Sequence, residues 1–113
     1  MIAARGGADQ VWGNGGDDVI CGGQGRDVLH ASDFGNNTVH GGQGRDELHG
    51  WQGNDTLDGN SGRDVLEAFT GNDTLNGGNG RDRLDGGPGN DSLNGGHGTD
   101  TCVNGESNAS CEA

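Results

Sequence analysis

The sequence has little of what an ordinary globular core requires. Only 27% of its 113 residues are hydrophobic and 4% are aromatic. A low hydrophobic content with a high net charge is typical of disordered chains, so a fold here needs a further source of stability. No apolar run approaches the ~20 residues that cross a bilayer, and residues 1–8 lack the basic start and apolar middle of a secretion signal. The length allows one domain at most.

Basic residues are equally scarce. The chain has no lysine, and six arginines stand against 18 acidic residues, which gives a formal net charge of −12. Nucleic acid and anionic membrane surfaces would repel such a chain, so cations are its natural partners. No spacing typical of a Ser-His-Asp or Cys-His catalytic set stands out, and we expect no enzymatic activity.

Glycine, in contrast, is abundant and periodic. Residues 4–103 divide into eleven nine-residue repeats, with Ala31 as one extra residue. The fourth place is always glycine, the sixth is aspartate in ten repeats and Asn37 in the other, and the eighth is apolar throughout. The eighth-place residues are Val11, Ile20, Leu29, Val39, Leu48, Leu57, Leu66, Leu75, Leu84, Leu93 and Cys102.

Each repeat predicts a turn followed by a short strand. Its first six residues can turn because glycine accepts a positive φ and Asn and Asp tolerate one. The last three form a strand whose eighth-place side chain points inward. Successive strands then lie on opposite sides of a thin core, so two repeats complete one coil and residues 18 apart stack at the ~4.8 Å spacing of paired strands. We therefore expect an all-β fold, a parallel β-roll (a β-helix or solenoid) of about five and a half coils.

The two edges of this roll differ in chemistry. We call the turns of odd-numbered repeats the odd edge and those of even-numbered repeats the even edge. Their fifth places alternate between arginine (Arg26, Arg45, Arg63 and Arg81) on the odd edge and asparagine (Asn36, Asn54, Asn72 and Asn90) on the even edge. We expect the arginines to pair with Glu47, Glu67 or Asp85.

The repeat G-G-x-G-x-D-x-U-x, in which U is a large apolar residue, resembles that of the RTX (repeats in toxin) family of secreted bacterial proteins. The resemblance covers residues 4–103. It implies a β-roll in which each Ca²⁺ ion lies between two turns stacked on one edge, bound by a sixth-place side chain from each turn and by carbonyl oxygens of the glycine-bearing places. Eleven buried side chains cannot by themselves offset the ordering of such a chain, so bound ions must contribute much of the stability.

The resemblance also assigns the ligands. The odd edge stacks Asp9, Asp27, Asp46, Asp64, Asp82 and Asp100, which allows five sites, and the even edge stacks Asp18, Asn37, Asp55, Asp73 and Asp91, which allows four. The expected carbonyl ligands are Gly23, Gly25, Gly42, Gly44, Gly53, Gly62, Gly71, Gly78, Gly80, Gly87 and Gly89. Oxygen ligands suit calcium, whereas nitrogen and sulfur ligands for zinc are not repeated.

The two edges should differ in affinity. Odd turns mostly begin with two glycines, whereas three even turns begin with Ser32-Asp33, Gly50-Trp51 and Ala68-Phe69. A bulky side chain cannot cheaply take a glycine conformation, and Asn37 supplies no charge. We expect tighter binding on the odd edge and the weakest sites around Asn37.

Aromatic residues and histidines gather outside the expected core. Trp51 and Phe69 should stack, with Phe34 one coil earlier, either as a patch for binding or self-association or as a shield for the even turns. His30, His40 and His49 fall at the outward ninth place, where they are either solvated strand residues or a chance surface metal site.

The chain ends depart from the repeat. We expect residues 1–3 to be a leader and residues 104–113 to be a degenerate repeat that caps the roll. The cap places Cys111 at an inward eighth place after Cys102, which predicts a disulfide and an oxidising, extracellular compartment. Cys21 lies at an outward place without an obvious partner.

Two function classes follow. The first is a secreted calcium-binding module that folds on binding several Ca²⁺ ions and stabilises an attached domain or assists secretion. The alternative is a ligand-binding surface that is adhesive, carbohydrate-binding or ice-binding. The irregular third place of the even turns argues against ice.

Overall fold

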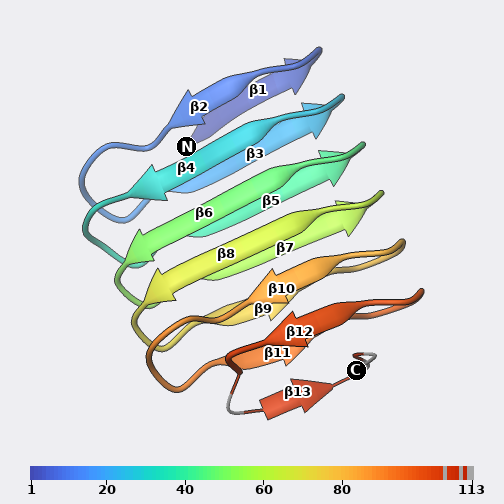
Figure 1. Cartoon of the computed structure of the whole chain (residues 1–113). Coiled ribbons are helices and arrows are strands. Elements are labelled where there is room, and N and C mark those ends of the chain that lie inside the picture. The colour runs from blue at the N-terminus through green and yellow to red at the C-terminus, as the bar shows by residue number, and fades with distance from the viewer. Residues whose placement is uncertain (106, 110, 112–113) are drawn as a thin grey trace.

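The computed structural model describes residues 1–105, 107–109 and 111, and these form thirteen strands in two parallel sheets. Sheet A contains β1 (Ile2–Gly6), β3 (Val19–Gln24), β5 (Thr38–Gln43), β7 (Thr56–Ser61), β9 (Thr74–Asn76), β11 (Ser92–Asn94) and β13 (Ser107–Ala109). Sheet B contains β2 (Gln10–Trp12), β4 (Val28–Ser32), β6 (Glu47–Gln52), β8 (Val65–Thr70), β10 (Arg83–Asp85) and β12 (Thr101–Val103). The chain alternates between the sheets and advances one coil every two strands (Figure 1). The predicted all-β parallel roll is confirmed.

The core consists of two facing rows of side chains between the sheets, one row from each sheet. Leu48 pairs with Leu66, and Leu66 pairs with Leu84, so residues 18 apart lie side by side as the repeat predicts. The buried hydrophobic residues are Ile20, Leu29, Ala31, Val39, Leu48, Leu57, Leu66, Ala68, Leu75, Leu84 and Leu93. Val11 and Cys102 are partly buried against them near the ends of the roll. In β3 to β8 most strands are longer than the expected three residues, because they continue into the following turn.

The extra residue lies in a turn and not at Ala31. His30 pairs with His49 and Ser32 pairs with Trp51, which places Ala31 opposite Gly50, at the first place of its repeat. Ala31 is fully buried in the core. The insertion is therefore absorbed between Ser32 and Gly35, where the chain already bends and no ladder of hydrogen bonds has to be kept.

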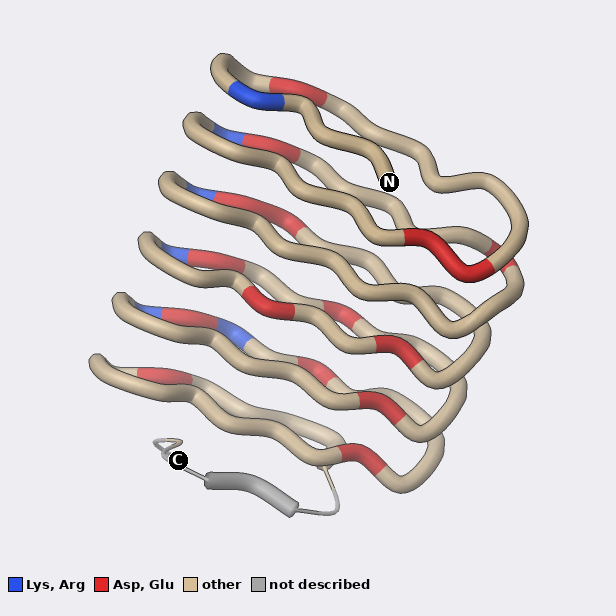
Figure 2. Tube along the Cα trace, turned by 180° about the vertical axis from the view of Figure 1, so that it is seen from behind, with Lys and Arg blue, Asp and Glu red and all other residues tan. Residues whose placement is uncertain are grey.

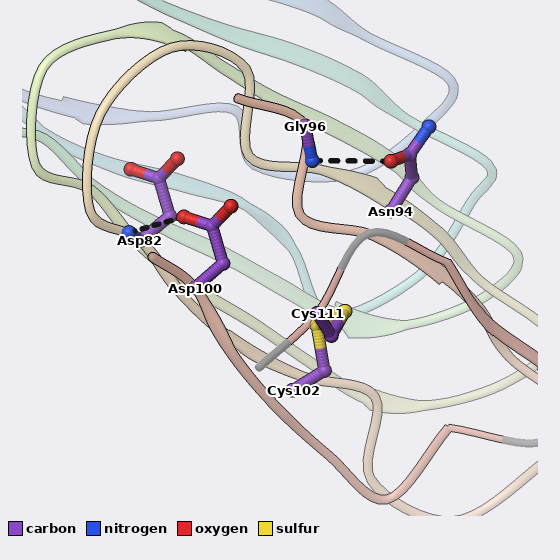
Figure 3. Close-up of a disulfide and its surroundings, with 6 residues drawn as sticks. All are labelled: Asp82, Asn94, Gly96, Asp100, Cys102 and Cys111. Carbon is purple, nitrogen blue, oxygen red and sulfur yellow. Dashed lines mark hydrogen bonds between the residues drawn. A yellow bond between two sulfur atoms is a disulfide. The ribbon is translucent and has the colours of Figure 1, made fainter. Parts of the chain in front are cut away.

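Both ends also differ from the expected frame. The roll begins inside the expected leader, because Ile2 of β1 pairs with Ile20. At the other end Leu93 pairs with Asn108, fifteen residues later, so Cys111 does not stack on Leu93 as a regular repeat would require. The predicted disulfide between Cys102 and Cys111 is nevertheless confirmed, with a Cα–Cα distance of 5.7 Å (Figure 3).

Bulky residues take glycine-like conformations on the even edge, contrary to the expectation from their size. Trp51 and Phe69 have φ angles of +77° and +71°, in the left-handed region. Their rings stack with centroids 4.5 Å apart and planes 2° from parallel. Stacking of this kind is worth ~0.5–1.5 kcal/mol beyond buried area, which offsets part of the backbone strain. The turns at Trp51 and Phe69 thus keep the positive φ that Gly23, Gly42 and Gly78 have at the second place of the odd turns.

The fourth-place glycines are fixed by contact between coils. Gly62 has a φ of +123°, and a Cβ atom there would lie 1.6 Å from the carbonyl oxygen of Gly44. Gly62→Ala should therefore destabilise the roll by ~3 kcal/mol or more, because both the close backbone contact and the φ angle oppose a side chain. Thermal unfolding in calcium measures the effect. Gly15→Ala is the matched control, since nothing lies within 4 Å of a Cβ there, and equal losses for the two variants would contradict the prediction.

Candidate metal centre

The sixth-place side chains form two acidic columns, one along each edge of the roll (Figure 2). Each column stacks one side chain per coil because the strands pair at intervals of one coil. Inside the roll these side chains are almost completely buried, with exposed fractions of 0–2% for Asp27, Asn37, Asp46, Asp55, Asp64, Asp73, Asp82, Asp91 and Asp100. Burying carboxylates in rows is costly unless each one has a partner.

From the second coil on, one oxygen of each side chain has a backbone partner. The Oδ1 atom of Asp64 accepts a hydrogen bond from the N–H of Asp46 at 2.8 Å, and that of Asp100 accepts one from the N–H of Asp82 at 2.7 Å (Figure 3). The same bond recurs between consecutive coils on both edges. This ladder is a structural role that the repeat pattern alone does not reveal.

The other oxygen, Oδ2, is buried and lacks a hydrogen-bond partner within the described part of the chain. This holds for Asp9, Asp18, Asp27, Asp46, Asp55, Asp64, Asp73, Asp82 and Asp100. It faces a small space beside the first-place glycine: a Cβ atom on Gly59 would lie 2.6 Å from Asp64 Oδ2 and 2.8 Å from the carbonyl oxygen of Gly77. A carboxylate and a carbonyl of the next coil thus converge on one point, as a hard cation such as Ca²⁺ requires.

The glycines of each turn shape this space. The second-place and fourth-place glycines expected as ligands all have positive φ angles, from +78° to +128°. The first-place carbonyl oxygens, for example those of Gly41 and Gly77, also face the carboxylates, although they are not among the expected ligands. In the sequence, this role is indicated by the first glycine of the G-G pair, because a Cβ atom at that place would fill the space beside Oδ2.

Burial strongly disfavours the charged form of these carboxylates. It raises the pKa of Asp64 to about 8 and that of Asp73 to about 7, with repulsion from stacked neighbours adding to the rise and backbone hydrogen bonds opposing it. For Asp55 and Asp82 burial raises the pKa to about 6, and it also raises the pKa of Asp27 and Asp46. Near neutral pH the columns therefore need either protons or bound cations.

Asn37 differs from the aspartates of its column because its side chain is an uncharged amide, which donates hydrogen bonds and does not need a cation. Its Oδ1 atom keeps the ladder bond, accepting from the N–H of Asp18 at 2.8 Å. Its Nδ2 atom donates to Asp55 Oδ1 at 3.1 Å, to Ser32 Oγ at 3.2 Å and to the Gly35 carbonyl at 3.4 Å. An amide N–H therefore points at the fourth-place carbonyl of Gly35, which is of the kind expected to bind the cation, and at the ladder oxygen of Asp55.

The fifth-place residues are mostly asparagine on the even edge and arginine on the odd edge, and in the part of the chain that the structure describes the arginines do not make the contacts that we expected. On the even edge Asn36, Asn54 and Asn72 accept hydrogen bonds from the N–H of Asn54, Asn72 and Asn90, at 2.8–3.0 Å. These amides thus form a second ladder on the surface.

Among the described residues, no arginine nitrogen lies within 4.0 Å of Glu47, Glu67 or Asp85, so the expected pairing is not found. Glu47 instead lies 3.0 Å from His49.

The aromatic residues form a wider group than the sequence suggests. On the outer face of sheet B, His30 stacks between Trp12, at 3.8 Å, and His49, at 4.9 Å. Phe34 is 67% exposed and makes no described ring contact with Trp51. It lies instead on the rim of a hollow that Trp12, His30 and Trp51 also line. His40 lies apart from this group, 3.8 Å from Asp58 on sheet A.

Comparison with known proteins agrees with this geometry. No similarity to a curated protein was found. Among the described residues no helix is long and apolar enough to cross a membrane. Residues 1–29, 32–66 and 67–102 match the model of the RTX calcium-binding nonapeptide repeat (4 copies). With most of its length matched and its carboxylates stacked for a hard cation, the chain belongs to the RTX calcium-binding nonapeptide repeat family and is a Ca²⁺-binding repeat module.

Proposed function

We propose that this calcium-binding module folds when it binds several Ca²⁺ ions outside the cell, where it stabilises an attached domain or assists secretion. The observation that carries the proposal is the row of buried Oδ2 atoms, those of Asp46, Asp55 and Asp64 for example, that have no hydrogen-bond partner among the residues that the structure describes. Calcium supplies the positive charge that such a row needs, and the aspartates and turn carbonyls hold it between coils. No catalytic role is assigned to any residue.

The charge of the chain makes calcium a condition for folding. In the unfolded chain the acidic residues are apart and solvated, but folding stacks them one coil from one another in a dry interior. An ion that binds only the folded state shifts the equilibrium toward that state by mass action. The module would then remain unfolded at low calcium concentrations and fold at high ones.

The disulfide supports an extracellular location. A disulfide between Cys102 and Cys111 persists in oxidising compartments and is rare in the reducing cytosol of most bacteria. It joins the last strand of sheet B to the C-terminal segment, so it would hold the open end of the roll closed. We infer that the bond forms only after the chain has left the cytosol.

Removal of calcium tests the proposal. With excess chelator the far-ultraviolet circular dichroism spectrum should be that of an unfolded chain, and added Ca²⁺ should restore a β spectrum in a cooperative titration. Mg²⁺ at the same concentration is the control, because its smaller, stricter coordination shell fits these flexible sites poorly. A β spectrum that persists after complete removal of calcium would refute calcium-dependent folding.

A substitution at Asn37 tests the difference between the edges. Asn37→Asp should add at least one bound Ca²⁺ per chain and lower the calcium concentration at the folding midpoint, because a second carboxylate oxygen replaces the donating amide. In chelator the same variant should be less stable, since it adds one more buried charge. Calorimetric titration gives the ion count. Asn36→Asp adds the same charge at an exposed place outside the column, and an equal effect there would attribute the gain to net charge alone.

A second candidate function is recognition of a carbohydrate on the outer face of sheet B. The hollow there has a volume of about 530 Å³, within the usual range for small-ligand sites, and its lining joins aromatic rings to the polar side chains of Asn14, Ser32 and Asp33. Sugars present flat apolar faces edged by hydroxyl groups, which suits such a lining. Trp51 is also held at a positive φ that costs energy, as is common at binding sites.

Glycan screening of the calcium-loaded protein tests this second function. A bound oligosaccharide should lose at least about tenfold in affinity, ~1.4 kcal/mol, with Trp51→Gly, which restores the usual residue of that place and should leave the fold intact. Val19→Ala, exposed on sheet A, should bind as the parent does. If no glycan binds, or if Trp51→Gly leaves binding unchanged, the hollow is not a sugar site.

A further inference from the structure

The outer face of sheet B contains a group of metal-ligating side chains that the calcium columns do not use. Glu47 and His49 lie two residues apart on β6, and Glu67 on β8 pairs directly with His49. Side chains two residues apart on a strand share a face, so all three project from the same side of the sheet. Their carboxylate oxygens and the imidazole nitrogen lie within 4.8 Å of one another.

These separations match what one small metal ion needs. Ligand atoms ~2.1 Å from a tetrahedral zinc ion are about 3.4 Å from each other. The Nε2 atom of His49 and Oε1 of Glu47 are 3.0 Å apart, and one ligand atom from each of the three residues lies within 4.8 Å of the other two. The side chains therefore need to approach one another by little more than about 1 Å to reach the spacing of a zinc site.

The imidazole is held in place and shielded from water. His49 is only 8% exposed, because the rings of His30, Trp51 and Phe69 surround it at centroid distances of 4.9, 6.2 and 5.9 Å. Its Nδ1 atom is buried and has no hydrogen-bond partner among the described residues. A rigid, poorly hydrated imidazole next to carboxylates loses little freedom or solvation when a metal binds.

The local charge also favours a cation. Asp85 pairs with Glu67 across the sheet, and its Oδ1 atom already accepts hydrogen bonds from the N–H of Gly87 and from Asn104 Nδ2. Asp85 is therefore a neighbouring negative charge and not a ligand. The Nε2 atom of His49 lies 3.0 Å from Oε1 of Glu47, and no ion pair of Glu67 is found among the described residues, which leaves its carboxylate for a metal.

We propose that Glu47, His49 and Glu67 form a second class of metal site, which takes a divalent transition metal such as Zn²⁺ and is separate from the calcium columns. An imidazole combined with carboxylates selects zinc or its neighbours in the first transition row over calcium, which prefers oxygen ligands only. The remaining coordination position would hold water. The metal would link β6 to β8 on the outside of the roll, as calcium links coils at the edges.

Zinc binding to the calcium-loaded protein tests this proposal. The experiment uses the full chain with Cys21→Ser, because Cys21, a free and half-buried cysteine, is opposite His40 in the pairing of β3 with β5 and could bind zinc there. Isothermal titration in saturating Ca²⁺ should show one Zn²⁺ per chain. Both His49→Gln and Glu67→Gln should weaken binding at least about tenfold, and Co²⁺ should give the visible absorption of a four-coordinate site.

The control variants distinguish this site from zinc binding elsewhere on the chain and from loss of the fold. His40→Gln, on sheet A beside Asp58, should bind zinc as the parent does. Circular dichroism in calcium checks that each variant is folded, and Glu67→Gln, at a partly exposed surface position, provides a test if His49→Gln does not fold. Absence of zinc binding in saturating calcium, unchanged affinity in Glu67→Gln, or loss of binding in His40→Gln would each overturn the proposal. None of these outcomes bears on calcium-dependent folding, which the chelator experiment measures separately.

Discussion

The burial of stacked carboxylates is the constraint on which the rest of this roll depends. The nine-residue repeat places an aspartate at the same point of ten of its eleven turns, and strand pairing brings those of every second turn one coil apart in a column. From the second coil on, one oxygen of each side chain accepts the ladder hydrogen bond, but the Oδ2 atoms of aspartates such as Asp46 and Asp64 have no hydrogen-bond partner among the described residues. Because the hydrophobic core consists of only two facing rows of side chains, one from each sheet, it is too small to compensate for such columns. The strength with which neighbouring coils hold together therefore depends on the protons or cations that neutralise the carboxylate columns.

The sequence predicts the repeating part of this structure well because nearly every coil has the same kinds of residue at its inward, glycine and aspartate places. The inward place of Leu57, the positive φ of Gly62 and the column of Asp64 all follow from the spacing. It predicts the departures less well, since each depends on contacts between coils. Ala31 is the residue that breaks the frame in a linear reading, yet pairing of Ser32 with Trp51 moves the insertion into the turn. The register of the cap likewise follows from pairing with β11 and not from the frame.

Trp51 and Phe69 show why side-chain size alone is a poor guide to the backbone conformation of a turn. Each residue taken singly should avoid a positive φ, but the two occupy equivalent places one coil apart, so their rings stack across the coil. The stacking energy is available only because both residues take the same unfavourable conformation. In a solenoid such an interaction between neighbouring repeats adds directly to stability. Replacing one of the pair therefore removes the strain of one residue together with the stacking contact that joins the two coils.

The coils around Asn37, where we expect the weakest calcium sites, also carry the ring stack on sheet B. Asn37 follows β4, and its amide donates to the fourth-place carbonyl of Gly35 and to the ladder oxygen of Asp55. Across β2, β4 and β6, Trp12, His30 and His49 stack in one line on the outer face. Contacts between rings do not depend on calcium, so this part of the roll retains a link between coils when the ion link is lost. Since stability in a solenoid is a sum over neighbouring coils, the aromatic face can compensate locally for the missing carboxylate without any change in the path of the chain.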